Sequence, residues 1–219
     1  MSEKRKIEKR YDAWSRWYDA VDTNPLFGGK AQERWRREAI GLLELKKGES
    51  VIDLGTGTGL ILPWISESCK GAHVVGIDIS GKMLLRARKK GCADLVRGDL
   101  DCMPFKDSSL DKAIATFTLT TAPDPVAFLK DTARVLKDDG ILVILDTGKP
   151  KKKGARAVHA LISKTAKLSG HTKIDRDPYA LLGKVPEMKI EKEKRYYGGM
   201  VYAMKIRKFI SLNPIITPK

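Results

Sequence analysis

The sequence has few of the residues on which disulfides, metal sites and histidine-based catalysis depend. Its three cysteines, Cys69, Cys92 and Cys102, form an odd set without CxxC spacing. This pattern argues for reduced, packed thiols rather than disulfides or a zinc site. Only three histidines occur among 219 residues, so few can serve as a general base. We therefore expect a protein of the cytoplasm without a metal centre.

Long apolar runs and internal repeats are also missing. No stretch of about 18 apolar residues occurs, so we expect no transmembrane helix. The first ten residues, MSEKRKIEKR, are charged and lack the apolar segment of a secretory signal. With 219 residues, 42% of them hydrophobic, the chain is long enough to bury the core of one α/β domain.

Negative charge is scarce in the last third of the chain. Residues 147–219 hold 18 Lys and Arg against 5 Asp and Glu, so most of the net charge of +15 lies there. This asymmetry favours an anionic partner such as a membrane surface, a nucleic acid or an acidic substrate. A solvated lysine-rich surface, as in heat-adapted proteins, would give the same composition. Composition alone does not distinguish these explanations.

Strand and helix patterns alternate from residue 50 onward. Ser80 is a suitable N-cap for a helix over residues 82–90, and a helix over 126–136 ends before Asp138-Asp139-Gly140. Gly198-Gly199 joins the last two expected strands, which is a hairpin signal. The expected strands are 50–54, 72–79, 94–97, 110–117, 141–146, 188–197 and 200–209. The alternation predicts a mainly parallel sheet with right-handed crossovers that ends in an antiparallel pair.

Three glycines stand at alternate positions after the first strand, in VIDLGTGTG. Gly55, Gly57 and Gly59 follow Asp53, so the pattern DxGxGxG differs from the dinucleotide fingerprint GxGxxG. A carboxylate at this point would repel a pyrophosphate. S-adenosylmethionine instead presents an ammonium, a sulfonium and one carboxylate. Asp53 suits the ammonium, and free backbone N–H groups at the helix start suit the carboxylate.

Acidic residues also follow the next two strands. The carboxyl ends of parallel strands meet at one edge of a sheet, where ligands bind. Asp78, in GIDIS, is placed to accept both ribose hydroxyls, and Asp99, in GDLDCMPF, to accept the adenine amino group. Leu100 would pack on the adenine ring, while Thr116 and Phe117 end the fourth strand and would line the cleft.

These motifs together resemble those of the class I S-adenosylmethionine-dependent methyltransferases over residues 51–146. VIDLGTGTG, GIDIS and GDLDCMPF are similar to the first three family motifs, and the run from LDKAIATF to GILVIL is similar to the fourth and fifth strands. The resemblance implies an α/β, Rossmann-like sheet of seven mostly parallel strands with an antiparallel last strand. It further implies helices on both faces, here with an N-terminal helical cap, and S-adenosyl-L-methionine as cofactor.

We expect a single methyltransferase domain over residues 1–219. It would comprise N-terminal helices (1–48), the cofactor-binding core (49–146), a basic insertion (147–187) and a terminal β-hairpin (188–209). The predicted cofactor-binding residues are Tyr18, Asp53, Gly55, Thr56, Gly57, Gly59, Asp78, Ile79, Asp99, Leu100, Thr116 and Phe117.

Several segments bear on the methyl acceptor. GTGTGLILPWI, VVGIDISGKMLLRARKK and the pair YDAWSRWYD and PLFGG are similar to phospholipid N-methyltransferases. The YD element and the ending GGMVYAMKIRK resemble ubiquinone and menaquinone C-methyltransferases. Phospholipid amine N-methylation is the favoured interpretation, in lipid metabolism, and C-methylation of a quinone precursor is an alternative. An RNA or protein methyltransferase and a non-catalytic methyltransferase-like binding subunit remain open, although TTAPDP replaces the [DN]PP[FY] motif.

A lipid-like acceptor would give the basic residues a partner. We expect peripheral contact with an anionic membrane through the basic C-terminal third, including KPKKKGAR, and regard nucleic acid as the less favoured partner. The N-terminal helix is a second candidate, because its Ile7, Tyr11, Trp14, Tyr18 face opposes Arg5, Lys6, Lys9 and Arg16. Trp14 and Trp17 are nevertheless expected to pack that helix onto the domain, and Tyr18 to cover the cofactor.

No catalytic residue is assigned from the sequence. A sulfonium is already an activated electrophile, so the protein mainly aligns donor and acceptor. His73 begins a strand far from the cleft, while His159 and His171 are expected on the surface of the basic insertion. Tyr11 and Tyr18 could orient an acceptor through their hydroxyls.

Overall fold

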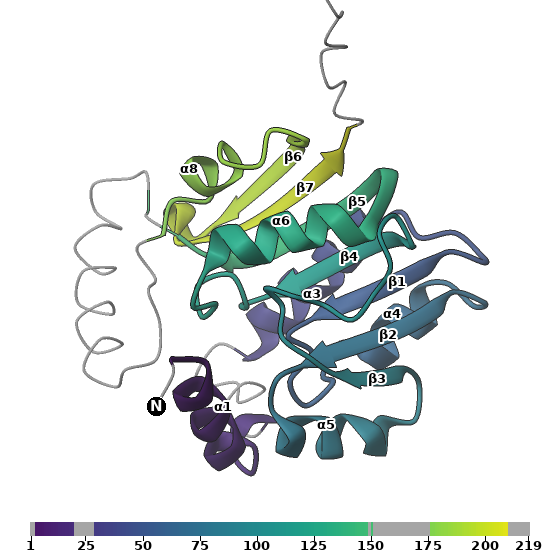
Figure 1. Ribbon diagram of the computed structural model, residues 1–219, viewed down its shortest axis with the longest axis vertical. Coiled ribbons are helices and arrows are strands. Elements are labelled where there is room, and N and C mark those ends of the chain that lie inside the picture. The colour runs from purple at the N-terminus through teal and green to yellow at the C-terminus, as the bar shows by residue number, and fades with distance from the viewer. Residues whose placement is uncertain (1–2, 20–28, 149, 151–175, 210–219) are drawn as a thin grey trace, which may run out of the picture.

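A computed structural model describes residues 3–19, 29–148, 150 and 176–209 (Figure 1). Its helices and strands are, in chain order, α1 (Glu3–Trp14), α3 (Gly29–Leu42), β1 (Ser50–Leu54), α4 (Leu62–Ser68), β2 (His73–Asp78), α5 (Gly81–Ala87), the 3₁₀ turn η2 (Arg88–Lys90), β3 (Asp94–Arg97), β4 (Leu110–Thr116), α6 (Pro125–Val135), β5 (Leu136–Thr147), α8 (Pro178–Leu182), β6 (Met188–Tyr196), the 3₁₀ turn η3 (Tyr197–Gly199) and β7 (Val201–Lys208).

The strands form one seven-stranded sheet in the order β3-β2-β1-β4-β5-β7-β6. The pairs among β1 to β5 are parallel, and β7 is antiparallel to both of its neighbours, β5 and β6. From β1 the sheet extends one way through β2 and β3 and the other way through β4 and β5, so the strand order reverses between β1 and β4. The predicted Rossmann-like sheet with an antiparallel last strand is confirmed, and its switch point lies at the β1 and β4 carboxyl ends.

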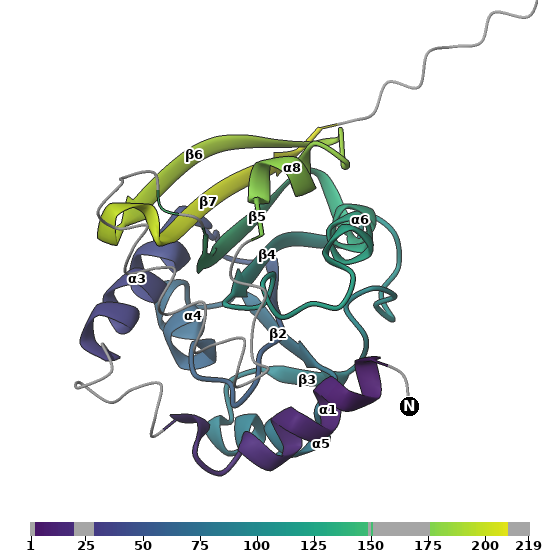
Figure 2. The same ribbon diagram turned by 90° about the vertical axis from the view of Figure 1, so that its left-hand side faces the viewer.

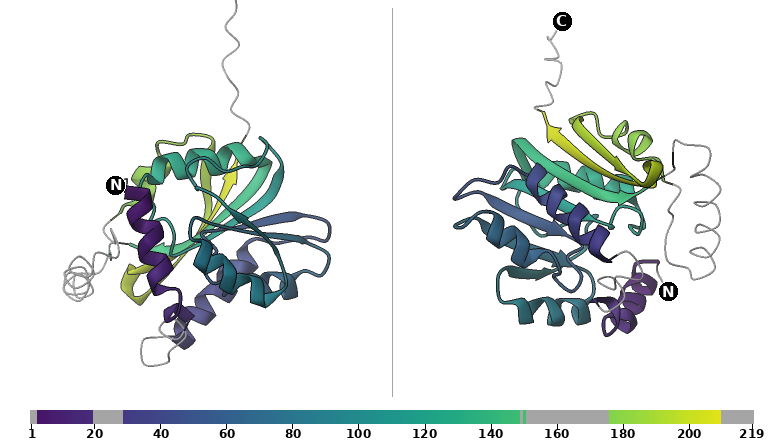
Figure 3. Two further views of the ribbon diagram at one scale, coloured as in Figure 1. Left: turned by 60° about the horizontal axis from the view of Figure 1, so that its bottom comes forward. Right: turned by 180° about the vertical axis from the view of Figure 1, so that it is seen from behind.

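Helices cover both faces of the sheet because the central strands are apolar on both sides. Phe128 and Leu129 of α6 pack with Leu142 and Ile144 on one face. On the other face, α3 and α4 pack over the sheet, as the view from behind shows (Figure 3). At the β3 edge, α1 and α5 lie side by side (Figure 2). The N-terminal helical cap therefore lies at the carboxyl edge of the first strands.

One local prediction holds and one needs correction. Ser80 caps α5, where its hydroxyl accepts a hydrogen bond from the Met83 amide. Strand β5, however, begins at Leu136, directly after α6, rather than at Ile141. The predicted turn is a bulge inside this strand: Leu136 pairs with Leu110 and Ile141 with Lys112, and Asp139 adopts a φ of 60°. Turn residues such as Asp-Gly predict that a strand begins only after them. Here β4 pairs with β5 on both sides of these residues, so they form a bulge within one strand.

Two burial predictions are wrong. Cys102 is exposed rather than packed, although all three cysteines are free. Trp14 is 39% exposed and Trp17 69% exposed, so neither packs α1 tightly onto the domain. Within the described residues, no helix combines the length and apolar character needed to cross a membrane. Most of the basic insertion, with His159 and His171, lies outside the described residues.

Candidate cofactor site

The glycine loop after β1 packs closely against Thr118 at Gly55 and is open at Gly57. Gly55 has a φ of +72°, and a Cβ there would lie 2.7 Å from Thr118 Cγ2. Gly57 has a φ of +54°, and a Cβ there would meet nothing closer than the Gly55 carbonyl oxygen at 4.0 Å. Gly55 is therefore needed for packing against the β4 loop. Gly57 instead leaves backbone accessible to a ligand.

Asp78 holds the ends of β2 and the glycine loop together. Its carboxylate accepts hydrogen bonds from the Gly57 amide and the Ser80 amide, each at 2.8 Å. Burial raises the pKa of Asp78, and the backbone hydrogen bonds from Ser80 and Gly57 oppose that shift. A carboxylate offers about four acceptor positions, so two remain for the hydroxyls of a ribose.

A small pocket under the glycine loop contains opposite charges. Asp53 is 2% exposed and accepts a hydrogen bond from the Thr56 hydroxyl at 2.6 Å. Burial raises the pKa of Asp53 to about 7, while the Thr56 hydrogen bond and the Arg36 charge oppose the shift. Arg36 of α3 is 3% exposed and also lines this pocket, with its guanidinium 5.0 Å from the Phe117 ring centroid. The pocket can therefore hold an ammonium and a carboxylate of one ligand.

A larger pocket adjoins it along the glycine loop, with an empty volume of about 570 Å³. The two pockets share Tyr18, Gly55, Gly57 and Thr116. Ten of the twelve predicted residues line one pocket or both: Tyr18, Asp53, Gly55, Thr56, Gly57, Asp78, Ile79, Leu100, Thr116 and Phe117. Residues up to 100 positions apart in the sequence are thus brought to one edge of the sheet.

The other two predicted residues have different surroundings. A Cβ on Gly59 would lie 2.9 Å from both Ala87 Cβ and Leu62 Cδ1, so this glycine permits helix packing. The Asp99 carboxylate is 2.5 Å from the Lys4 ammonium and is not among the residues that line the pockets. The assignment of Asp99 to the adenine amino group stays a prediction, which requires Lys4 to move or to share this acid.

Helix α1 forms the outer wall of the larger pocket. Ile7 and Tyr11 of this helix line it together with Tyr18, which follows the helix, and with Asp78 and the glycine loop. None of the residues of α1 is fully buried. Polar contacts attach the helix instead: Asp12 accepts hydrogen bonds from the Ser80 hydroxyl and the Lys82 amide. A ligand in the pocket would therefore lie between the sheet edge and a helix with a largely polar attachment.

Arg36 is the site residue that the sequence analysis missed. A signal for it was present, because Arg36, Ala39 and Ile40 recur at helical spacing on the buried face of α3. A basic residue on an apolar helix face needs a partner, since an unpaired buried charge is costly. Arg36 lies over the Phe117 ring and its charge acts on Asp53 of β1, and only the folded chain brings these residues next to α3.

Known families and proteins match this geometry. The methyltransferase-domain family model matches residues 52–144. A demethylmenaquinone methyltransferase of Listeria monocytogenes is 30% identical over 164 residues, which cover 72% of this chain and 68% of the relative. The chain belongs to the class I S-adenosylmethionine-dependent methyltransferases.

A second relative is more similar over a shorter part. The demethylmenaquinone methyltransferase of Corynebacterium kroppenstedtii is 36% identical over 146 residues, which cover 67% of this chain and 62% of that protein. This chain thus matches less than two thirds of the length of that relative.

Solved structures share the fold of this methyltransferase-family chain. An S-adenosylmethionine-dependent methyltransferase from Mesorhizobium loti has a TM-score of 0.64 and 23% identity, with 78% of this chain and 96% of that chain covered. The [4+2]-cyclase SpnF has a TM-score of 0.74 and 16% identity, with 93% and 95% covered. A similar fold accompanies different chemistry, so function must be argued from the site.

The family implies S-adenosylmethionine as cofactor, and the residues present fit it. Asp53 and Arg36 can hold the ammonium and carboxylate of its methionine part, beside the open side of Gly57. Asp78 retains acceptor positions for the ribose, and Ile79 and Leu100 offer apolar surface for the adenine. These roles follow from the position and chemistry of each group.

Replacement of Asp78 tests the ribose assignment. We expect Asp78→Asn to weaken binding of S-adenosylhomocysteine by about 1.5–3 kcal/mol, or about 10- to 100-fold, because hydrogen bonds to a charged group are lost. Isothermal titration calorimetry would measure the affinity. Asp94→Asn is the matched control. Asp94 is the first residue of β3, at the edge of the sheet away from the carboxyl ends of the strands, and this variant should bind as the unmodified protein does. Equal affinity in both variants would contradict the assignment.

The pH dependence of binding tests the role of Asp53. An ammonium binds the ionised carboxylate, and the pKa of Asp53 is raised to about 7. The affinity for S-adenosylhomocysteine should therefore rise about tenfold per pH unit from about pH 5.5 and level off above about pH 7. Asp53→Asn should bind more weakly at neutral pH and lose this dependence. The same slope in the variant would show that another group titrates.

Proposed function

We propose that this chain transfers a methyl group from S-adenosylmethionine to a ring carbon of a quinone precursor. The observation that carries the proposal is the match to demethylmenaquinone methyltransferases, at 30% identity over 68% of the Listeria protein. This match supports the quinone alternative better than phospholipid amine N-methylation, which the sequence motifs favoured. The acceptor would be an apolar, lipid-soluble aromatic ring.

The lining of the larger pocket supports an acceptor of this kind. Ile7 and Tyr11 of α1 line it together with Phe117, Ala122 and Pro123, which follow β4. These side chains are apolar or aromatic, whereas Asp78 and the glycine loop supply polar groups to the same lining. A flat ring could pack on the apolar side chains while the polar groups hold the cofactor. Such a mixed lining suits a charged cofactor and an apolar acceptor.

The described residues would act mainly by placing the two reactants and excluding water. When bound, the cofactor supplies an electrophilic methyl group. Tyr11 shares a hydrogen bond with Thr121, and burial raises the pKa of its hydroxyl, so Tyr11 stays protonated at neutral pH. It can then donate a hydrogen bond to a ring oxygen of the acceptor. That contact would orient the ring carbon toward the cofactor side of the pocket.

An acceptor assay tests the proposal. The full chain would be incubated with S-adenosylmethionine carrying a ¹³C methyl group and a short-chain demethylmenaquinone analogue kept reduced. We expect one labelled methyl group on a ring carbon, identified by mass spectrometry and NMR. Phosphatidylethanolamine in mixed micelles is the competing acceptor. Label on its amine, or no product from the reduced analogue while S-adenosylhomocysteine binds, would contradict the proposal.

Tyr11→Phe tests the orienting hydrogen bond. We expect kcat/KM for the reduced analogue to fall about three- to tenfold, the size of one neutral hydrogen bond, with cofactor affinity unchanged. Tyr179→Phe is the matched control: Tyr179 of α8 donates to Glu193 at 2.5 Å and does not line either pocket. Unchanged kcat/KM in Tyr11→Phe, or an equal loss in both variants, would remove Tyr11 from the mechanism.

A further inference from the structure

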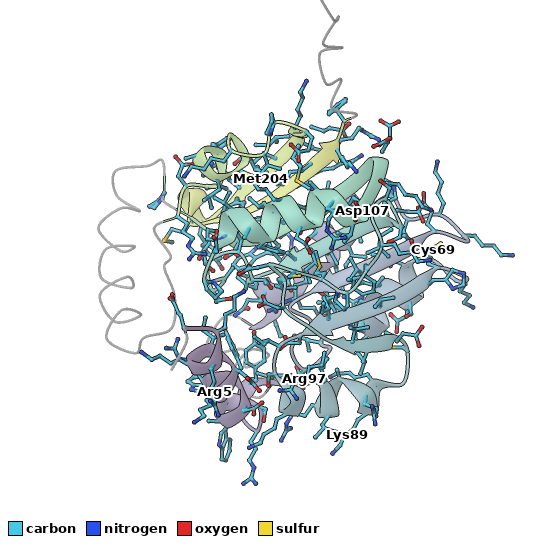
Figure 4. The ribbon with its side chains drawn as sticks, in the orientation of Figure 1. Arg5, Cys69, Lys89, Arg97, Asp107 and Met204 are labelled. Atoms are coloured by element: carbon cyan, nitrogen blue, oxygen red, sulfur yellow. The ribbon has the colours of Figure 1, made fainter. Side chains whose placement is uncertain are left out.

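The surface formed by α1, the turn after it, α5 and η2 is strongly basic. In residues 3–19 and 81–90 seven lysines and arginines are exposed, among them Lys6, Lys9 and Lys89, against one exposed acid, Glu3. We call this region the α1–α5 surface. Figure 4 shows Arg5 and Lys89 along the same lower edge of the molecule, which α1 and α5 form together. This surface is therefore one of the basic regions of the protein, apart from the basic C-terminal third.

Glu8 and Asp12 of α1, and Asp19 in the turn after it, face the domain. Glu8 pairs with Arg97 of β3 at 2.6 Å, and Asp12 accepts a hydrogen bond from the Ser80 hydroxyl at 2.5 Å. Asp19 accepts a hydrogen bond from the Thr58 hydroxyl and lies 3.5 Å from the Lys90 ammonium. Lys4 also contacts the domain, through Asp99 and Asp101. Attachment of α1 thus uses Glu8, Asp12 and Lys4, and leaves Lys6 and Lys9 exposed.

Large apolar side chains are exposed within the same basic region. Trp17 is 69% exposed, Leu85 of α5 is 61% exposed and Trp14 is 39% exposed. A single exposed apolar residue is ordinary. Two tryptophans and a leucine among lysines match the composition of surfaces that insert into lipid headgroups, where indole rings reside at the boundary between water and hydrocarbon.

We propose that the α1–α5 surface docks on an anionic lipid membrane. Its lysines and arginines would attract the headgroups, and Trp17 and Leu85 would insert between them. Single-stranded RNA could also use lysines and indole rings, but an exposed leucine gives it no stacking surface. Ile7 and Tyr11 of α1, and Tyr18 in the turn after it, line the larger pocket. Docking would therefore bring the membrane against the helix that covers the site.

Vesicle co-sedimentation tests the docking without any methyl transfer, so its result does not depend on the proposed acceptor. The full chain would be mixed with vesicles of phosphatidylcholine and phosphatidylglycerol, and with vesicles of phosphatidylcholine alone. We expect binding to the anionic vesicles that weakens as salt is added. Lys9→Glu with Lys89→Glu should lower the partition coefficient at least tenfold. Trp17→Ala should lower it severalfold and reduce the fluorescence blue shift on binding.

A charge-matched control separates this surface from the basic C-terminal third. Lys184→Glu with Lys192→Glu changes the net charge equally, near α8 and on β6 at the other end of the molecule (Figure 1). This pair should retain most of the binding. Equal loss in both pairs, or full binding by the Lys9 and Lys89 pair, would overturn the proposal. Binding to a single-stranded RNA oligonucleotide through Lys9 and Lys89, without vesicle binding, would also overturn it.

Discussion

The hydrogen bond from the Gly57 amide to the Asp78 carboxylate joins the carboxyl ends of β1 and β2. The site depends on it, because it fixes the open side of the glycine loop relative to the acid at the next strand end. The contact requires a left-handed backbone at Gly57 and close packing of Gly55 against Thr118. Parallel strands supply the rest of the geometry, since their carboxyl ends converge at the switch point between β1 and β4.

Burial of charge gives this site its chemical character. Asp53 and Arg36 are both nearly inaccessible to solvent and line one pocket. An ion taken out of water is costly unless it is paired, so such a site favours a ligand with complementary charges. The zwitterionic end of an amino acid has both. The outer wall differs, because α1 covers the larger pocket without a single fully buried residue. Its attachment through ion pairs is weaker and more salt-sensitive than apolar packing.

The charges of α1 connect the site to the surface. Glu8 and Asp12 are turned toward β3 and α5, and these contacts attach α1 over the pocket while Lys6 and Lys9 remain exposed. Tyr11 and Tyr18 face the pocket, while Trp17 faces solvent. This segment is held to the domain partly by acidic side chains, lines the pocket with aromatic side chains and exposes basic ones. It can therefore enclose a ligand and contact a charged surface at the same time. This arrangement would suit an enzyme whose acceptor resides in a membrane.

Local sequence was sufficient for much of the fold. The strands Ser50–Leu54 and Asp94–Arg97 have the predicted bounds, and the Ser80 cap is present, because propensity, apolar pattern and capping act within a few residues. The DxGxGxG pattern and the acid that ends β2 likewise predicted residues that line the two pockets, since a parallel sheet aligns strand ends. Three features needed the tertiary structure: the bulge in β5, the approach of Arg36 to Asp53, and the exposure of Trp14 and Trp17. Each depends on contacts between segments distant in sequence, and periodicity within one segment carries no information about its neighbours.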